Sequence, residues 1–277
     1  MRIQSKLSVA IILAVGSASF ASVSLAQSTV LYDTAGSLTP DQSPWGWTYQ
    51  AIGPVSPTFS GGATQLDTSA SDAYQAGFAR FTPNALNASL GYTVRFDLKT
   101  LSEDHSNSAS DKNSDGLSDR AGIAVIVLGS DHKGVELDFW QNEIWAQQIS
   151  PIFTHSQTSE RGFLDTTAAG TGVDGLDRYD LKIIGNSYSL FANGASSALL
   201  TGLLKDYSAG PIIYSSTNFL FIGDNNTTTR GSFQLSHVEA IVAPEPGSIV
   251  ILGIASGLLT LGTRAIRHST RRKKRSV

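Results

Sequence analysis

Through most of the chain, apolar and polar residues alternate in short runs that are separated by clusters of Gly, Asn, Asp and Ser. In residues 92–99, Tyr-Thr-Val-Arg-Phe-Asp-Leu-Lys, nearly every second side chain is apolar, which is typical of a strand with one buried face. Residues 123–128 are continuously apolar and predict a central strand that is buried on both faces. Comparable patterns predict strands over residues 29–32, 46–52, 76–81, 91–101, 122–129, 134–140, 143–149, 179–184, 188–192, 218–222 and 233–242.

The turns between these runs indicate how the strands connect. Gly185-Asn186 lies between two strand patterns and predicts a tight hairpin, and residues 140–143 join two aromatic-rich strands. Between the two ends of the chain, only residues 197–207 fit a short helix. Short alternating strands joined by tight turns predict an all-β domain, a sandwich of antiparallel sheets of the concanavalin-A-like or jelly-roll type.

The N-terminus has the three parts of a secretory signal. Arg2 and Lys6 are positive, residues 7–15 are almost entirely apolar, and small residues follow up to Ala26. The apolar run is too short for a transmembrane anchor, and small residues follow it. We therefore expect a signal peptide over residues 1–26, helical in its apolar part and removed after Ala26.

The C-terminus has a second, longer apolar segment. Pro244, Glu245 and Pro246 are followed by residues 247–263, which carry no charge, and then by seven Arg or Lys residues within 264–277. Seventeen helical residues span about 26 Å, close to the thickness of the hydrocarbon core. A basic cluster after such a helix resists translocation. These features predict a transmembrane helix over about 247–263 with a cytoplasmic basic tail.

The order of these three parts resembles the PEP-CTERM sorting signal of Gram-negative bacteria. The resemblance is carried by Pro244-Glu245-Pro246, the apolar helix and the basic tail. It implies recognition by an exosortase-type membrane protease, transient insertion in the inner membrane and removal of the tail. It further implies delivery to the cell surface or extracellular matrix, where exopolysaccharide is a candidate partner.

Removal of both ends leaves a β-sandwich ectodomain over residues 27–243, long enough to bury its own core. This part has 11 basic and 22 acidic residues, a net charge of −11, which the basic tail masks in the whole-chain value of −3. An acidic surface repels phosphate backbones and disfavours nucleic-acid binding. The absence of cysteine excludes thiol catalysis, iron–sulfur clusters and cysteine-zinc sites.

Several motifs of this middle part resemble the choice-of-anchor domains of exported bacterial proteins, most closely the type labelled Y. The resemblance covers most of the middle part, from about residue 30 to about residue 240. It implies a sandwich similar to concanavalin-A-like domains, and the family has no established activity. The motifs are Phe96-Asp97-Leu98, Asp119-Arg120-Ala121-Gly122, Val125-Ile126-Val127-Leu128, Gly134-Val135-Glu136-Leu137, Glu143-Ile144-Trp145-Ala146-Gln147 and Asn218-Phe219-Leu220-Phe221-Ile222-Gly223-Asp224-Asn225.

An acidic loop is the sharpest candidate metal site. Residues 111–119 match the first nine positions of an EF-hand-type calcium loop, although Gly122 stands where the bidentate Glu is expected. Calcium would then need a further carboxylate from Glu103 or Asp104. The alternative is an acidic turn that is merely solvated. The predicted Ca²⁺ ligands are Asp111, Asn113, Asp115, Asp119 and the carbonyl of Leu117.

Two further sets of residues suit carbohydrate chemistry. Glu136 and Asp138 share one face of a predicted strand, and Glu143 follows beyond a turn. Some sandwich-fold glycosidases carry carboxylates in this manner, but the spacing to Glu143 differs from theirs, so we expect no catalytic residue. Tryptophan rings can stack on sugars, although most pack in cores. The glycan-binding candidates are Trp45, Trp47, Trp140 and Trp145.

The sequence thus favours a non-enzymatic surface or matrix protein whose sandwich binds glycan or protein. The alternative is a divergent glycosidase or other polysaccharide-active enzyme on the same fold.

Overall fold

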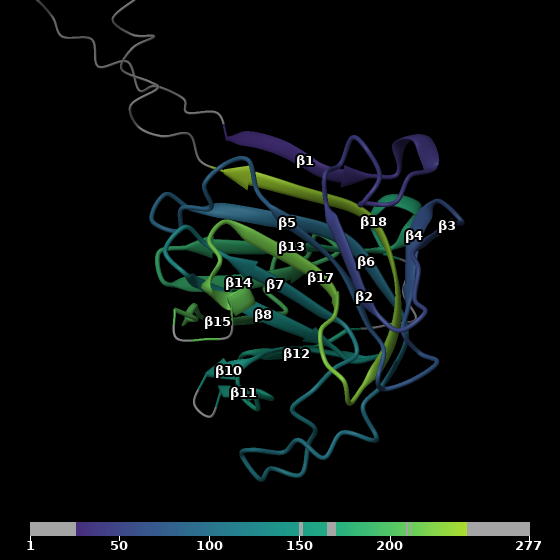
Figure 1. The fold of residues 1–277 in the computed structure, drawn as a ribbon. Helices are drawn as coiled ribbons and strands as arrows, with labels where there is room; N and C mark the ends of the chain where they lie inside the picture. Colours follow the sequence, from purple (N-terminus) through teal and green to yellow (C-terminus); the bar gives the residue numbers. More distant parts are fainter. Residues whose placement is uncertain (1–25, 150–151, 165–169, 209, 211, 243–277) are drawn as a thin grey trace, which may run out of the picture. The chain divides into compact units, whose positions relative to one another are not determined.

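A computed structural model describes residues 26–149, 152–164, 170–208, 210 and 212–242. These residues belong to one compact unit, which is built from two large antiparallel sheets (Figure 1). The predicted signal peptide, sorting motif, transmembrane helix and basic tail lie outside the described residues, except Ala26. In the part of the chain that the structure describes, no helix is long and apolar enough to cross a membrane.

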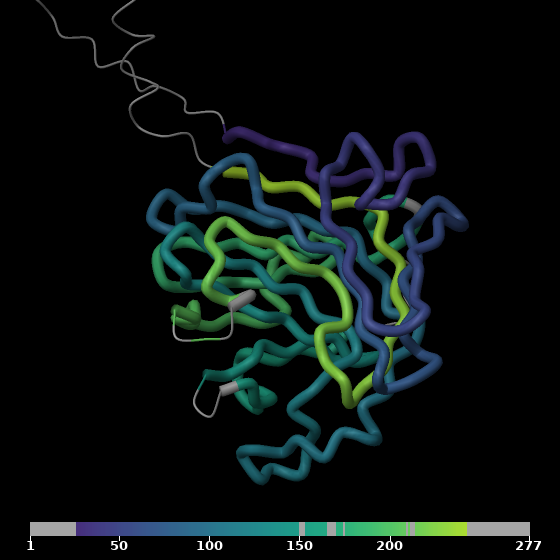
Figure 2. The backbone as a smooth tube through the Cα atoms, viewed as in Figure 1, coloured from purple at the N-terminus to yellow at the C-terminus, as the bar shows by residue number. Residues whose placement is uncertain are grey.

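The first sheet, sheet A, is centred on two long strands that pair along almost their whole length. β6 (Tyr92–Asp104) and β18 (Arg230–Val242) have 13 residues each, and their register shifts between Ser232 and Phe233 and again between Leu235 and His237. β1 (Gln27–Asp33) adds to β18, so both ends of the described chain lie side by side (Figure 2). The order is β15 (Leu200–Leu203), β14 (Ser187–Ala192), β13 (Asp177–Ile184), β6 (Tyr92–Asp104), β18 (Arg230–Val242), β4 (Ala63–Asp67) and β3 (Thr58–Ser60).

The second sheet, sheet B, carries the candidate site. Its order is β12 (Arg161–Phe163), β9 (Glu143–Ala146), β8 (Lys133–Phe139), β7 (Ala124–Leu128), β17 (Phe219–Asp224), β5 (Gln75–Phe81) and β2 (Thr48–Ile52). A short strand, β16 (Lys205–Asp206), pairs with β8, while β10 (Gln148–Ile149) and β11 (Ile152–Thr154) form a separate hairpin. Three short 3₁₀ turns complete the fold: η1 (Ala35–Ser37), η2 (Val173–Gly175) and η3 (Ile212–Ser215).

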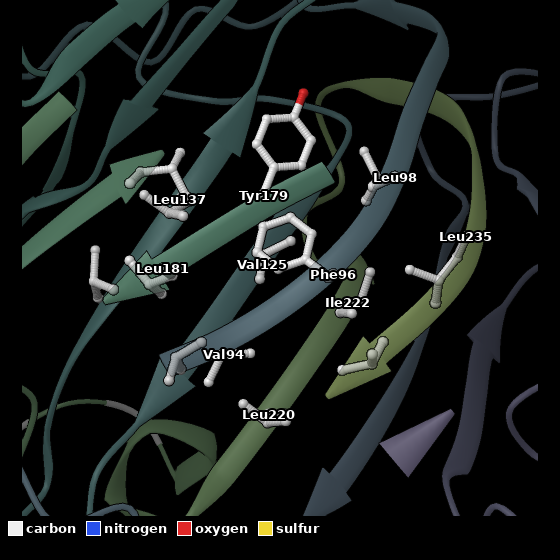
Figure 3. Close-up of a cluster of buried hydrophobic side chains, with 14 of the residues drawn as sticks. Val94, Phe96, Leu98, Val125, Leu137, Tyr179, Leu181, Leu220, Ile222 and Leu235 are labelled. Carbon is white, nitrogen blue, oxygen red and sulfur yellow. The ribbon is translucent and has the colours of Figure 1, made fainter. Parts of the chain in front are cut away.

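The main core lies between the two sheets, where alternate residues of each strand interdigitate (Figure 3). Phe96 and Tyr179 of sheet A stack with ring centroids 5.1 Å apart, and Phe139 of sheet B meets Phe96 edge-on at 6.2 Å. Val125 and Leu137 are completely or almost completely buried beside them. Burial of this many large apolar side chains is the main stabilisation of the sandwich.

A second apolar layer covers the outer face of sheet B, the face turned away from sheet A. It joins Ile126 and Leu128 of β7 and Phe219 and Phe221 of β17 to Tyr207 and Tyr214 from the loops that follow β16. Because both faces of β7 are covered, all five of its residues are buried. The prediction of a central strand buried on both faces is therefore confirmed.

The structure also confirms the all-β sandwich and the two predicted turns. Gly185 has a φ of 61° in the hairpin between β13 and β14, and the amide of Trp140 donates to the carbonyl of Glu143 at 2.8 Å. The prediction of a short helix over residues 197–207 is wrong. Leu200–Leu203 and Lys205–Asp206 form β15 and β16, because pairing with β14 and β8 satisfies the hydrogen bonds of their backbone groups. A short isolated helix would be only marginally stable.

Candidate functional site

A pocket of about 550 Å³ opens on the outer face of sheet B. We call it the outer-face pocket. Its floor holds Glu136 and Asp138 from β8 and Gln147, which follows β9. Its wall includes Arg120, Phe153 and Tyr214, and its rim is made of Gln75, Ser110, Asn225, Asn226, Thr227 and Thr228.

The alternation of β8 explains why two carboxyl groups lie on the outer face. Val135, Leu137 and Phe139 point into the core between the sheets, so Glu136 and Asp138 must point the opposite way. Both carboxyl residues are only 2% exposed. The sequence-based prediction that they share one strand face is confirmed by their common pocket.

Glu136 is fully engaged by neutral donors. The Tyr214 hydroxyl donates to its Oε2 at 2.7 Å, and the Asn225 side-chain amide donates to its Oε1 at 2.8 Å. Burial raises the pKa of Glu136, and these two hydrogen bonds act in the opposite direction. Tyr214 and Asn225 thus hold this carboxyl in a fixed position.

Asp138 has a buried carboxyl oxygen that no hydrogen-bond donor contacts. The Gln147 side chain lies close enough to the carboxyl group to lower its pKa, while Asp138 Oδ2 and Gln147 Oε1 are buried with no hydrogen-bond partner. Burial and the neighbouring Glu136 charge raise the pKa of Asp138 well above its usual range. Buried polar atoms are seldom left unpaired, so two such oxygens lining one pocket indicate a place for a ligand.

Arg120 supplies positive charge close to both carboxyl groups. Its guanidinium donates to the carbonyls of Asp119 and Phe153 at 2.7 and 3.0 Å, which fixes it in the pocket wall. Its charge lowers the pKa of both Glu136 and Asp138, although burial outweighs this effect. Among the described residues that line the pocket, Arg120 is the only cation.

A second hollow of about 460 Å³ lies beside the pocket and is lined by residues of β5 and β2. The two hollows share Gln75 and Asn225, so they adjoin on sheet B, and we call the two together the groove. Asp224 lines the second hollow and accepts hydrogen bonds from the Thr68 hydroxyl at 2.6 Å and the Asn226 amide at 3.2 Å. Burial raises the pKa of Asp224 to about 7 despite these bonds.

Glu143 belongs to a different cluster from the Glu136–Asp138 pair. It lies beyond the predicted turn, where it accepts from Arg161 at 2.8 Å and lies 3.0 Å from His155 Nε2. Trp140 is stacked between His155 and His105, with ring centroids 4.7 and 4.2 Å apart. Sequence spacing gave no sign of this His–Trp–His stack, because its three members come from three separate segments.

Three carboxyl groups of the predicted calcium loop accept hydrogen bonds from the protein itself. Asp111 accepts from the amides of Asp115 and Gly116, both at 3.0 Å. Asp119 is completely buried and accepts from the amides of Lys112 at 2.6 Å and His155 at 2.8 Å. Asp115 Oδ1 accepts from the Leu117 amide and Oδ2 from the Asn113 amide group. Within the described ranges, no group of three acidic or histidine side chains is placed to hold a metal ion, and calcium stays a prediction.

The four tryptophans do not form one exposed surface. Trp47 and Trp145 are 4% and 0% exposed, and Trp140 is 8% exposed between its two histidines. Trp45 is half-buried and packs edge-on against Tyr32. A ring without an accessible face cannot stack on a sugar, so the structure does not support Trp47, Trp140 or Trp145 as a glycan platform. Phe153 and Tyr214 are the aromatic residues of the pocket instead.

No protein-family model matches the chain, and no curated protein matches it. Among solved structures, a carbohydrate esterase of the Shiga toxin-encoding bacteriophage phi24B is 12% identical with a TM-score of 0.46, over 79% of this chain and 100% of that one. A protein of unknown function with a galectin-like fold from Bacillus subtilis is 11% identical with a TM-score of 0.41, over 79% and 100%. The binding domain of botulinum neurotoxin serotype G is 11% identical with a TM-score of 0.41, over 81% and 50%. Similarity at this level says nothing about ligands.

Proposed function

We propose that this chain is an exported surface or matrix protein whose sandwich, of the concanavalin-A-like or jelly-roll type, binds a glycan in the outer-face pocket. The observation that carries the proposal is the pair of buried, unpartnered oxygens, Asp138 Oδ2 and Gln147 Oε1, on the pocket floor. A ligand rich in O–H or N–H groups would satisfy both acceptors, which protein groups leave unsatisfied.

The rim of the pocket supports a carbohydrate over an apolar ligand. Gln75, Asn225 and Asn226 contribute amides, and Thr227 and Thr228 contribute hydroxyls. Amides and hydroxyls both donate and accept, so they match the hydroxyl groups of a sugar. Phe153 and Tyr214 offer apolar surface for the ring face of a sugar. The groove formed with the second hollow has room for more than one residue of a polymer.

Binding is tested by electrophoresis of the full-length protein through gels that contain dextran, cellulose ether or chitosan. We expect at least one polysaccharide to slow the protein relative to a non-binding reference protein. Unchanged migration across such a panel, and in titrations of short oligosaccharides, would contradict glycan binding.

The export part of the proposal is supported by the two ends of the sequence. Pro244-Glu245-Pro246, the apolar residues 247–263 and the basic residues of 264–277 are what an exosortase-type protease would read. Mass spectrometry of the mature protein from its host should find an N-terminus near Gln27 and loss of the basic tail. A mature chain that retains both ends would contradict this part alone.

A second candidate function is a polysaccharide-active enzyme. It is favoured by one observation, the two carboxyl groups of Glu136 and Asp138 on the same face of β8 inside one pocket. The two functions differ in turnover. New reducing ends after incubation with a retained polysaccharide would establish the enzyme, and retention without new ends would establish a binding protein.

A further inference from the structure

We infer that the outer-face pocket recognises the protonated amine of an amino sugar. Asp138 and Gln147 would accept hydrogen bonds from its ammonium group. The inference rests on the proposed glycan binding and names the class of glycan. It is carried by the chemistry of the pocket floor and by the balance of charges around it.

The first argument is the number of acceptors on the floor. Asp138 Oδ2 and Gln147 Oε1 are both buried and both without a partner, and the Gln147 side chain lies close enough to the Asp138 carboxyl group to lower its pKa. The two free oxygens therefore lie near each other, and neither residue is more than 3% exposed. A hydroxyl group has one hydrogen to donate, whereas an ammonium group has three. One ammonium group can satisfy both oxygens and still donate to a third acceptor.

The second argument is the charge balance of the pocket. Two acidic residues, Glu136 and Asp138, face one cation, Arg120, among the described residues that line it. Glu136 already receives two hydrogen bonds from Tyr214 and Asn225, while Asp138 Oδ2 receives none and the charge of Arg120 offsets the burial of Asp138 only in part. A buried carboxylate is costly without a counter-charge. An ammonium group on the ligand would supply that charge.

The pocket discriminates against the acetylated form of the same sugar. An acetamide has one N–H and no charge, so it leaves one floor oxygen unpaired and adds no positive charge beside Asp138. Long-range charge acts in the same direction. Residues 27–243 carry a net charge of −11, which attracts cationic glycans toward the surface.

Binding of the amine should release a proton. In the empty pocket, burial and the charges of Glu136 and of Glu103 on β6 raise the pKa of Asp138, and Arg120 only partly opposes them. Tyr207 and Tyr214 are the other titratable groups that interact with Asp138, and the pKa of each is raised too. Protonated Asp138 plus ligand ammonium then gives the Asp138 carboxylate–ammonium pair plus one proton in solution. Affinity for the amine therefore rises with pH while the amine stays protonated.

The experiment is isothermal titration of the full-length protein at pH 6 with a β-1,4-linked glucosamine tetrasaccharide and with its fully N-acetylated counterpart. Titration in two buffers of different ionisation enthalpy measures the protons released. We expect the amine form to bind about tenfold or more tightly than the acetylated form, because it gains one charge-assisted hydrogen bond. Binding of the amine form should also release a proton.

The matched variants are Asp138→Asn, which keeps the shape of the side chain, and Asp67→Asn, an exposed carboxylate on β4 of sheet A. Asp138→Asn should lose both the preference and the proton release, and Asp67→Asn should keep both. If Asp138→Asn fails to fold, Gln147→Leu removes the second acceptor and should reduce the preference.

Equal affinity for the two tetrasaccharides, or a preference that survives Asp138→Asn, would overturn the inference. If the protein binds neutral glycans and ignores the amine, the inference fails while the proposed glycan binding stands. If it binds no glycan of either kind, both fail together.

Discussion

Tyr214 is the residue on which the geometry of the pocket floor most depends. Its hydroxyl is buried, donates to Glu136 at 2.7 Å and comes from the loop that covers sheet B. Removal of a donor from a buried carboxyl leaves that group under-satisfied, which costs more than the net value of an ordinary hydrogen bond.

We therefore expect Tyr214→Phe to lower the free energy of unfolding by about 1–3 kcal/mol, as measured in urea. Tyr92→Phe is the matched control, because the Tyr92 hydroxyl is buried without a hydrogen-bond partner. Its loss should change stability by less than about 0.5 kcal/mol, or raise it slightly. Equal losses in the two variants would show that the Tyr214–Glu136 bond contributes nothing.

Asp224 should make stability depend on pH. Its pKa is about 7 in the folded protein against 3.8 in its unperturbed state, because burial opposes the charge. Between pH 4 and pH 7, the unfolded chain therefore loses this proton while the folded protein keeps it. In this window the Asp224 carboxyl group therefore lowers the free energy of unfolding as pH rises, by at most about 1.4 kcal/mol per pH unit.

The variant Asp224→Asn removes the contribution of Asp224 to the pH dependence of stability. Urea unfolding at several pH values should show the parent losing stability relative to the variant between pH 4 and pH 7, with a constant difference above pH 7. Parallel curves for parent and variant across the window would contradict the effect of burial on the Asp224 carboxyl group.

The sequence could place single residues only where the alternation of a strand decides which face of the sheet each side chain occupies. Glu136 and Asp138 could be placed together because residues i and i+2 share a face. Tyr214 and Asn225, which fix Glu136, lie 78 and 89 residues away along the chain. No local pattern reports a contact at that distance. Gln147 was visible only as one more polar position at the end of a strand.

At the scale of elements, the long loop that connects β6 to β7 has no regular secondary structure. It extends beyond the ends of the strands (Figure 2). Asp119 joins this loop to the segment after β11, because one carboxyl group accepts from Lys112 and from His155. Ser110 and Arg120 of the same loop reach the outer-face pocket. The loop therefore helps to shape the pocket.

Asp119→Ala should lower the free energy of unfolding by about 1–3 kcal/mol, since the buried His155 amide and the part-buried Lys112 amide lose their carboxyl acceptor. Hydrogen exchange of the amides of Lys112 and His155 should accelerate together. Asp67→Ala, which removes an exposed carboxylate that caps the Ser69 amide, is the control and should cost about 0.5 kcal/mol. Unchanged exchange in Asp119→Ala would show that this carboxyl does not join the two segments.

Calcium binding by the same loop remains open to a direct measurement. If Asp111, Asn113, Asp115 and Asp119 and the carbonyl of Leu117 hold Ca²⁺, added calcium should raise the melting temperature, and Asp115→Ala should abolish the rise. A parent protein whose melting temperature is the same with calcium and with a chelator would rule out this site.

Strands with clear alternation, or with an unbroken apolar run, could be located from the sequence within a few residues, as β6 and β7 show. The short strands were missed. β3, β12 and β16 have two or three residues each, too few to display any period, and they exist because a neighbouring strand offers partners. Pairing also explains why residues 200–206 form strands where a helix was expected.

At the scale of the whole molecule, the sandwich separates two tasks. The layer between the sheets supplies stability, whereas the outer face of sheet B holds buried polar groups that stability alone does not require. The fold class followed from strand spacing and turns. The site did not, because the tertiary fold alone brings together its parts, which come from β5, β8, β11, η3, the residue after β9 and the loops before β7 and after β17.

The central claim is that a glycan occupies the groove on the outer face of sheet B. Gln75 lies where the two hollows of this groove meet, so Gln75→Trp should obstruct both. Gln65→Trp on β4 is the matched control, since Gln65 is also a half-buried strand glutamine but belongs to sheet A.

The measurement is the retardation of both variants and the parent in gels that contain the polysaccharide that slows the parent most. We predict that Gln75→Trp migrates as if no polysaccharide were present and that Gln65→Trp is retarded like the parent. A folded Gln75→Trp protein that is retarded as strongly as the parent would place the glycan elsewhere and contradict the account.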